Sequence, residues 1–540
     1  MIGRYHYRFS EKSSGGTIVI LISFILILSA YTHLWNPLGF PSIFIDEGHY
    51  MRRVMHVING LGPQEPTGDY TKQYDHPYFG QLFLAAVLSL IGYPNSLNID
   101  QASSSVQIVE MLYLAPRLIM GILAIVDTFF IYKMAELRYN RKVALIAAVL
   151  FAVMPIGWMT RRILLEPIFL PLILSSVLFA VYYISQTRCN KTNNKKNNNI
   201  IMVLLSGIFL GLAIFTKLPA LAITPLVGFL IYSSNKNLKL LALWFTPVIL
   251  IPIIWPAYAI SIGDFDKWLD GIQWQSDREI RPLLSSMNSF FELDPIVFSI
   301  GIVGVAYTAL KKDFFPLLWV IPFLLLFASL GYSQVYFLIP IFPAFCIAGA
   351  ALIIDLTNKI LRNKKKTSIR QLLPFATISA IGIFGLISTT MLITTNPNSS
   401  FFNLYGLIID LIKGSVGTSS DDNDIKKITL IGDHWVAAFA WIPNDVLDYQ
   451  LDFRKFFSNQ EIKNENVILV VSKAFEEYLK NDFFRGRPVK INEQKQDLFS
   501  SSEPVAIFKE NSMRYDKNPY PYVNMRENRG VGNLEIRTNY

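Results

Sequence analysis

The sequence has little charge and little cysteine, and each shortage excludes a class of protein. Only 16% of the 540 residues are charged and 52% are hydrophobic, whereas about a quarter of a soluble domain is charged. The two cysteines, Cys189 and Cys346, lie in a polar loop and in an apolar run, so no disulfide framework is expected. The net charge of +9 comes from short loops between apolar runs. It is therefore no nucleic-acid signal, and the composition indicates a protein surrounded by membrane lipids.

The sequence also lacks the motifs of several enzyme classes. It has no Gly-rich phosphate loop and no Ser–His–Asp signature. Among its six histidines, His49, His56 and His76 are candidate metal ligands together with Asp75, but their spacing matches no tight zinc pattern. We predict that the protein uses no cofactor and no metal, with a divalent metal at these residues as the alternative.

Apolar runs long enough to cross a hydrocarbon core of roughly 30 Å recur from residue 17 to residue 395. No small-residue cleavage site follows the first run, so we interpret it as an uncleaved span and not as a signal peptide. Residues 78–93 are apolar but short, and we interpret them as a re-entrant or interfacial helix. The pattern predicts about eleven spans, at residues 17–35, 112–132, 143–160, 164–185, 200–215, 218–233, 239–258, 295–310, 314–330, 335–357 and 372–395.

The loops between these spans differ in charge, and this difference orients the chain. Basic residues gather at residues 4–12, 133–142, 188–196, 236–239, 311–312 and 359–370. We predict that these loops and the N-terminus are cytoplasmic in a multi-pass protein of the cell membrane. The outer face then holds a long loop at residues 36–111, a second loop at residues 259–294, and the tail.

The tail, residues 396–540, differs in pattern from the membrane part, residues 1–395. Short apolar runs at residues 428–431, 467–471 and 505–508 alternate with stretches of helical pattern. This alternation predicts a small extracytoplasmic α/β domain. At its root stands Asn398-Ser399-Ser400, which matches the pattern of an N-glycosylation acceptor. The predicted fold class is thus an α-helical polytopic membrane protein with a small C-terminal α/β domain.

The acidic pair Asp46–Glu47 follows the first span by about ten residues. Carboxylates at a membrane surface are costly unless they have a partner or a task. The segment that they open has one apolar face at helical spacing, which predicts a helix lying in the membrane interface. That face consists of Met51, Val54, Met55 and Ile58. The structural alternative is that Asp46 caps this helix and Glu47 complements its dipole.

Further polar residues fall on the predicted outer side. Arg117 lies inside a span, where a buried arginine needs an anionic partner. Lys217, at an outer turn, either snorkels or binds phosphate. The Arg-Arg-Ile-Leu-Leu-Glu-Pro stretch at residues 161–167 allows a local ion pair. Glycosyl transfer from a lipid phosphate needs such a mixture, because a carboxylate takes the acceptor proton and cations stabilise the phosphate leaving group. The residues are His49, Arg52, Arg53, Asp75, His76, Arg117, Arg161, Arg162, Glu166 and Lys217.

In their order and spacing these motifs resemble the membrane glycosyltransferases of the GT-C fold, over roughly residues 17–260. The most similar group is that of the protein O-mannosyltransferases and aminoarabinose transferases, families 39 and 83. The resemblance implies a polyprenyl-phosphate sugar donor, inverting transfer, Asp46 as catalytic base with Glu47 as its companion, and Glu166 where the family usually has Asp. Donor phosphate and substrate binding is then expected from His49, Tyr50, Arg53, Asp75, His76, Arg117, Arg162 and Lys217.

The chain departs from this group at several positions. Pro-Pro has become Pro77-Tyr78, the lysine that usually follows Gly is Gln81, and an arginine of the aminoarabinose group is His49. We predict transfer of a sugar, mannose or another hexose, to an acceptor hydroxyl. The acceptor is a protein, as in protein glycosylation, a lipid or a lipid-linked glycan.

Three alternatives stay open. They are a transporter or flippase of lipid-linked sugars, a non-catalytic sugar-binding scaffold and an oligosaccharyltransferase. The last would use a metal and carry a Trp-Trp-Asp-type motif, in place of which the tail offers Asp433-His434-Trp435.

Overall fold

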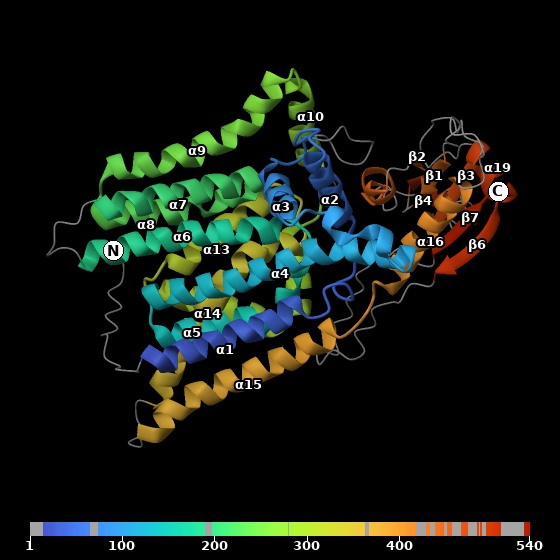
Figure 1. Ribbon diagram of the computed structural model, residues 1–540. Helices are drawn as coiled ribbons and strands as arrows, with labels where there is room; N and C mark the ends of the chain where they lie inside the picture. The colour runs from blue at the N-terminus through green and yellow to red at the C-terminus, as the bar shows by residue number, and fades with distance from the viewer. Residues whose placement is uncertain are drawn as a thin grey trace.

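The protein is a bundle of long helices with a small sheet domain at one end, as the computed structural model shows (Figure 1). The structure describes residues 15–64, 74–189, 197–278, 280–361, 367–416, 428–432, 438–447, 451–455, 466–472, 483–484, 487–488, 493–508 and 534–539. The predicted Asp433-His434-Trp435 motif lies outside the described residues. The fold class predicted from the sequence, helical and polytopic with a small α/β domain, is confirmed.

Every predicted span falls on a helix. By length and hydropathy, six of the described helices can cross a membrane alone, and up to nine crossings result if each bent pair counts as one. The chain is therefore a multi-pass membrane protein, and the count of about eleven stays a prediction. The helices on which the predicted spans fall are α1 (Gly15–Leu34), α4 (Ser105–Arg138), α5 (Arg141–Val153), α6 (Leu165–Cys189), α7 (Asn197–Thr216), α8 (Thr224–Asn235), α9 (Leu238–Ser261), α12 (Pro295–Leu310), α13 (Phe315–Ser329), α14 (Phe342–Leu361) and α15 (Thr367–Ile393).

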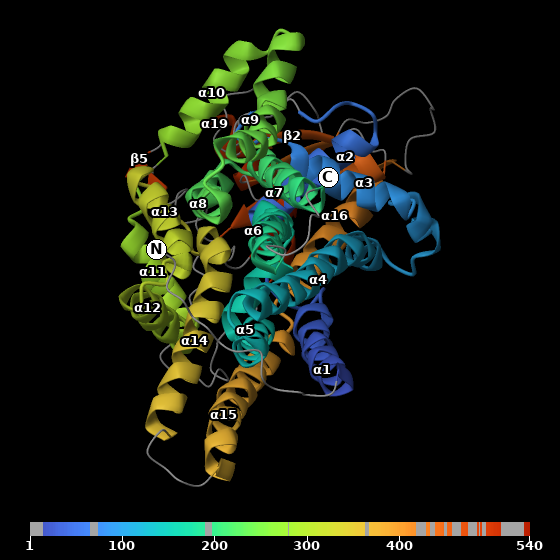
Figure 2. The same ribbon diagram turned by 90° about the vertical axis from the view of Figure 1, so that its left-hand side faces the viewer.

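Small residues let the bundle helices approach closely, as expected where lipid gives no hydrophobic drive for association. A Cβ atom on Gly207 of α7 would lie 2.3 Å from the Trp244 carbonyl of α9, and one on Gly211 would lie 2.5 Å from the Pro247 carbonyl. Figure 2, which looks along the bundle, shows α6 between α7 and α4. Three 3₁₀ segments join the bundle helices at the end that faces the sheet: η3 (Pro155–Arg161), η5 (Leu218–Ile223) and η6 (Val335–Ile341).

Shorter helices lie between the bundle and the sheet domain (Figure 1). They are α2 (Ile45–Ile58), α3 (Phe79–Leu90), α10 (Phe265–Ser276) and α11 (Leu283–Leu293), with the turns η1 (Asn95–Leu97) and η2 (Ile99–Gln101) after α3. The predicted apolar face of α2 is confirmed, because Met51, Val54 and Met55 are fully buried. That face packs into a protein core and not against lipid, since α3, α4 and α16 (Ser399–Val416) surround it.

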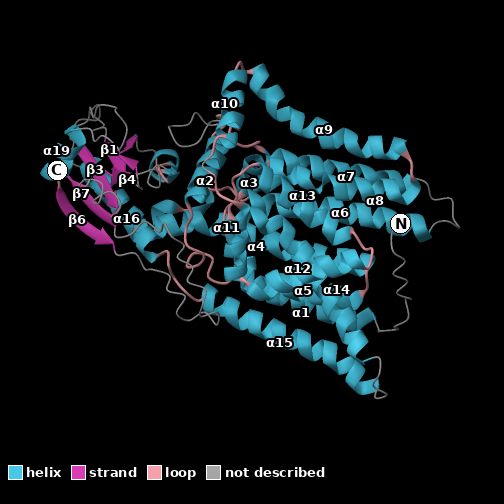
Figure 3. Cartoon of the chain, turned by 180° about the vertical axis from the view of Figure 1, so that it is seen from behind, coloured by secondary structure: helices cyan, strands magenta, loops and turns pink. Residues whose placement is uncertain are grey.

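The C-terminal domain contains all of the described strands, at the end away from the loops that join α4 to α5 and α8 to α9 (Figure 3). Its five-stranded sheet has the order β2-β1-β3-β7-β6, in which β1 pairs in parallel with β2 and β3 while β7 pairs antiparallel with β3 and β6. The three predicted apolar runs lie in β1 (Ile428–Gly432), β3 (Asn466–Ser472) and β6 (Glu503–Phe508). The other elements are β2 (Leu451–Lys455), β7 (Leu534–Thr538), the hairpin β4 (Phe483–Phe484) with β5 (Arg487–Pro488), the short π-helix η7 (Ile442–Val446) and α19 (Glu493–Ser501).

The orientation of the bundle in the membrane is testable with single cysteines. In a variant whose two native cysteines are replaced, Ser96→Cys in the predicted outer loop should react with an impermeant thiol reagent added to intact cells. Lys311→Cys in a predicted cytoplasmic loop should react only after the cells are opened, because basic loops stay inside. Both positions are exposed. Labelling of Lys311→Cys alone in intact cells would reverse the orientation.

Candidate active site

The site is built around the first turn of α2. Phe44 is the N-cap residue of this helix, and its main-chain N–H donates to Glu47 Oε1 at 3.0 Å. The alternative in which Asp46 caps the helix is therefore wrong, because Asp46 lies inside the first turn and is half-buried. Since successive helical residues point about 100° apart, Asp46 and Glu47 enter different surroundings.

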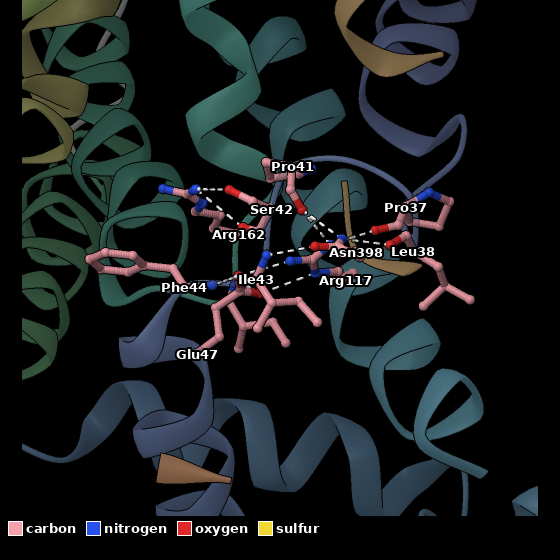
Figure 4. Close-up of polar contacts among 11 residues, drawn as sticks. Pro37, Leu38, Pro41, Ser42, Ile43, Phe44, Glu47, Arg117, Arg162 and Asn398 are labelled. Atoms are coloured by element: carbon pink, nitrogen blue, oxygen red, sulfur yellow. Dashed lines mark hydrogen bonds and ion pairs between the residues drawn. The ribbon is translucent and has the colours of Figure 1, made fainter. Parts of the chain in front are cut away.

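Glu47 belongs to a buried network that fixes the start of α2 (Figure 4). Both of its oxygens accept from the guanidinium of Arg117 on α4, Oε1 at 2.8 Å and Oε2 at 3.1 Å. The Ile163 N–H donates to Oε2 at 3.3 Å. The remaining donors of Arg117 reach the Pro37 and Pro41 carbonyls. The expected anionic partner of the buried arginine is thus Glu47, and the bidentate pair has its hydrogen bonds satisfied within the protein.

Arg162 binds the residues that lead into α2, on the side opposite Arg117 (Figure 4). Its Nη2 donates to the Ser42 carbonyl at 3.1 Å and contacts Ser42 Oγ at 3.0 Å. The guanidinium carbon lies 5.1 Å from the centre of the Phe44 ring and 4.8 Å from that of Trp158. Cation–π contacts of this kind help to orient a buried arginine.

Asp46 lies among charged groups from four other segments. The Tyr336 hydroxyl of η6 donates to Asp46 Oδ2 at 3.4 Å. Burial raises the pKa of Asp46 to about 6, with Lys217 opposing and Glu166 reinforcing the shift. Arg278, which follows α10, also lowers this pKa. A carboxylate poised near neutral pH is suited to accept a proton from a substrate.

Glu166 of α6 and Lys217, which lies between α7 and η5, form a buried ion pair. The Lys217 ammonium lies 2.5 Å from Glu166 Oε1, and the second oxygen, Oε2, has no hydrogen-bond partner among the described residues. The ammonium also lies 4.6 Å from the centre of the Phe337 ring. Lys217 is 4% exposed and Glu166 1%, so the pair contributes charge to the site while shielded from bulk water.

Asp75 and His76 complete the site on the side of α10. Arg53 donates to Asp75 Oδ1 at 2.8 Å. Burial alone would raise the pKa of Asp75, but Arg53 and His76 outweigh it and hold this pKa below its usual value. The Gln275 amide donates to the Asp75 carbonyl at 2.9 Å. Burial, together with Lys217 and Arg278, lowers the pKa of His76 well below its usual value, so the imidazole is neutral at pH 7.

Comparison with known proteins identifies a segment that matches a protein family and solved structures that have a similar fold. A sequence model of the family described as dolichyl-phosphate-mannose-protein mannosyltransferase matches residues 64–261. This stretch contains Asp75, Arg117, Glu166 and Lys217 and begins after Asp46. No curated protein sequence matches the chain significantly.

Two groups of solved structures are similar over most of the chain. One is the oligosaccharyltransferase of Archaeoglobus fulgidus tethered to an acceptor peptide, with a TM-score of 0.57 and 12% identity over 86% of this chain and 70% of that one. The other is ArnT from Cupriavidus metallidurans bound to undecaprenyl phosphate, with a TM-score of 0.53 and 12% identity over 98% of this chain and 99% of that one. This chain has the GT-C fold. The resemblance predicted from the motifs is thereby confirmed.

The predicted site residues of this GT-C protein fall into two groups. Those around the Asp46 carboxylate interact with it or with each other: Tyr50, Arg53, Asp75, His76, Glu166 and Lys217. The second group surrounds the entry to α2 and consists of Glu47, Arg117 and Arg162. His49 is buried on α2, and its predicted role stays a prediction.

Sequence reasoning missed Arg278 and Tyr336 of the GT-C site. The Arg278 guanidinium carbon lies 4.6 Å from the centre of the Trp274 ring and 4.9 Å from that of Tyr332. An isolated parallel bridge between Arg281 and Tyr332 ties the Arg278 loop to the loop before η6. The available signal was an arginine beside aromatic and polar residues in the predicted outer loop 259–294.

Proposed function

We propose that the protein transfers a sugar from a polyprenyl-phosphate donor to an acceptor hydroxyl, with Asp46 as general base. The reaction takes place at the outer face of the membrane that the chain spans. The observation that carries the proposal is the half-buried Asp46 carboxylate, whose pKa burial raises to about 6, lying within the electrostatic reach of Lys217 and Arg278. The GT-C fold and the stretch similar to mannosyltransferases support it. ArnT, one of the similar proteins, binds undecaprenyl phosphate.

In the proposed reaction the acceptor oxygen attacks the anomeric carbon as its proton passes to the Asp46 carboxylate. The bond from that carbon to the phosphate oxygen breaks, and the lipid phosphate leaves with the electron pair. A single displacement inverts the anomeric configuration. The Tyr336 hydroxyl, which donates to Asp46 Oδ2, orients the carboxylate. We propose mannose or another hexose as the sugar, because residues 64–261 match a mannosyltransferase family.

The leaving phosphate needs cations, and two groups are suited to this role. Arg278 forms no ion pair within the described part of the chain, and its Nε has no hydrogen-bond partner there. Trp274 and Tyr332 flank it without neutralising its charge. Lys217 is already paired with Glu166 and adds a weaker positive field. We propose that Arg278 binds the donor phosphate and that Lys217 supports it.

Glu47 and Arg117 take a different role in this proposal. Their donors and acceptors bind each other and the main chain of residues 37–47. We infer that they hold the Asp46 helix in place and that they touch neither the donor phosphate nor the acceptor.

The proposal is tested with purified protein in lipid vesicles that receive labelled polyprenyl-phosphate sugars one at a time, with peptide and lipid acceptors. Formation of a labelled product with one donor is expected. Movement of the labelled lipid between leaflets without product would favour a transporter. Transfer of a whole oligosaccharide to an asparagine would favour an oligosaccharyltransferase, to which the fold is also similar.

Activity is expected to survive exhaustive chelation, because clustered cations can neutralise the phosphate without a metal. No group of three potential ligands that could hold a metal occurs within the described ranges, and the His56 Nδ1–H donates to the Gly62 carbonyl at 2.9 Å. The measurement is the transfer rate before and after EDTA treatment. A complete loss that one divalent ion restores would contradict the prediction and favour an oligosaccharyltransferase-like mechanism.

A further inference from the structure

Asn398, the first residue of the Asn398-Ser399-Ser400 pattern, is buried at the junction between α15 and α16. Its side chain is 2% exposed, whereas a glycosylated asparagine lies on a surface loop. The amide nitrogen that would carry a glycan donates to the Leu38 carbonyl at 2.6 Å and to the Pro41 carbonyl at 2.9 Å. Its hydrogens are therefore used within the protein, and the pattern needs another explanation.

The side chain of Asn398 contacts one stretch of the chain, residues 36–44, which we name the connecting segment because it joins α1 to α2. Besides its two donated bonds, Asn398 Oδ1 accepts from the Ile43 N–H at 2.8 Å. Figure 4 shows the amide facing the carbonyls of this segment. Both amide hydrogens and the amide oxygen of Asn398 thus bind the segment that leads to α2.

Arg117 binds the same segment from α4. Its Nη1 donates to the Pro37 carbonyl at 2.8 Å and to the Pro41 carbonyl at 2.9 Å. The Pro41 carbonyl consequently accepts from both Arg117 and Asn398, which uses both of its lone pairs. Three carbonyls and one N–H of the connecting segment are held in this way.

The two anchors are themselves joined. The helix α16, which begins next to Asn398, packs on α4, and Ser105 donates to Asp410 at 2.5 Å between them. The connecting segment ends at the N-cap residue of α2, two positions before Asp46. A shift of about 1 Å in a catalytic group can cost about a hundredfold in rate, so this anchoring bears on the reaction.

We propose that Asn398 is a positioning residue, whose amide holds the connecting segment and thereby places the Asp46 carboxylate against the acceptor hydroxyl. This inference rests on the proposed function, in which Asp46 is the base. It assigns the Asn-Ser-Ser pattern to the geometry of the site and not to glycosylation.

Two variants and a matched control test whether Asn398 affects the rate of sugar transfer. Asn398→Ala removes all three bonds, and Asn398→Asp keeps the acceptor for the Ile43 N–H while it removes both N–H donors. Ser400→Ala destroys the glycosylation pattern and leaves the amide in place. In both Asn398 variants kcat should fall about tenfold to a hundredfold, while KM for the donor changes less than about threefold. The Ser400→Ala protein should match the wild type.

Hydrogen exchange tests the anchoring without any substrate. A peptide spanning residues 36–47 should exchange faster in the Asn398→Ala protein than in the wild type and the Ser400→Ala protein, while peptides from α6 are unchanged. If the wild type transfers no sugar, the proposed function fails, and the exchange result still decides whether Asn398 holds the segment.

Three results would overturn the inference. The first is an unchanged kcat in a folded Asn398→Ala protein whose wild type is active. The second is unchanged exchange of the connecting segment, and the third is a glycan found on Asn398 by mass spectrometry.

Discussion

The Asp46→Asn protein is expected to fold and insert but to transfer sugar far more slowly than the wild type. Asparagine has the shape of aspartate and still offers an oxygen to the Tyr336 hydroxyl, so the fold should tolerate the change. The side chain can no longer take the acceptor proton, and the loss of a general base costs about two to four orders of magnitude. Initial rates of transfer in vesicles measure the effect.

The pH dependence of the wild type gives an independent check on Asp46. Burial raises the pKa of its carboxyl to about 6, and only the ionised form can act as the base. The value of kcat/KM should therefore be half-maximal near pH 6, level off about one pH unit above it and fall about tenfold per pH unit well below it. The residual activity of the Asp46→Asn protein should lack this acidic limb.

A surface carboxylate supplies the control for the Asp46 experiment. Asp100 is exposed in the η2 turn, and Asp100→Asn should leave both the rate and its pH profile unchanged. Turnover of Asp46→Asn close to the wild-type rate would remove Asp46 from the mechanism, even if the protein proves to be a glycosyltransferase.

Arg278→Ala should weaken donor binding, whereas Arg117→Ala should weaken the fold. Charge-assisted hydrogen bonds contribute about 1.5–3 kcal/mol, so loss of the Arg278 contact should raise KM for the donor about ten- to hundredfold. Loss of Arg117 leaves Glu47 buried and uncompensated, which costs about 3–5 kcal/mol of stability. Donor titrations and thermal unfolding in detergent separate the two effects.

Arg278→Lys is the matched control, because it keeps the positive charge and loses only the planar donor geometry. It should bind the donor better than Arg278→Ala does. If instead Arg117→Ala abolishes donor binding in a stable protein while Arg278→Ala does not, then Arg117 is the phosphate ligand that the family resemblance implies.

Part of this site was predictable from local pattern. Apolar residues at helical spacing identified α2, and the cost of carboxylates at a membrane surface singled out the pair Asp46–Glu47 within it. The same reasoning required an anion beside Arg117, which the structure supplies as Glu47. Local pattern could not tell the two neighbouring carboxylates apart, because their separation depends on which helix packs on each side of α2.

The remainder of the site depends on contacts between distant segments. Glu166 of α6 pairs with Lys217, which follows α7, a pairing that spacing alone does not give. Arg278 reaches the site because the bridge between Arg281 and Tyr332 fixes its loop. The Asn398-Ser399-Ser400 pattern gave no sign of its buried position, because a short motif contains no information about burial. In each case the missing quantity was tertiary packing.

The buried cluster beneath α2 also bears on how the molecule unfolds. It joins Met51 of α2, Leu112 of α4, Tyr405 of α16, Leu430 of β1 and Ile468 of β3 in one continuous core. A cut at residue 396 would expose apolar surface on both fragments, and exposed apolar surface promotes aggregation. The C-terminal sheet is thus expected to melt together with the ends of the membrane helices that face it, as one cooperative unit. A soluble fragment for separate study should include a redesigned face in place of that core.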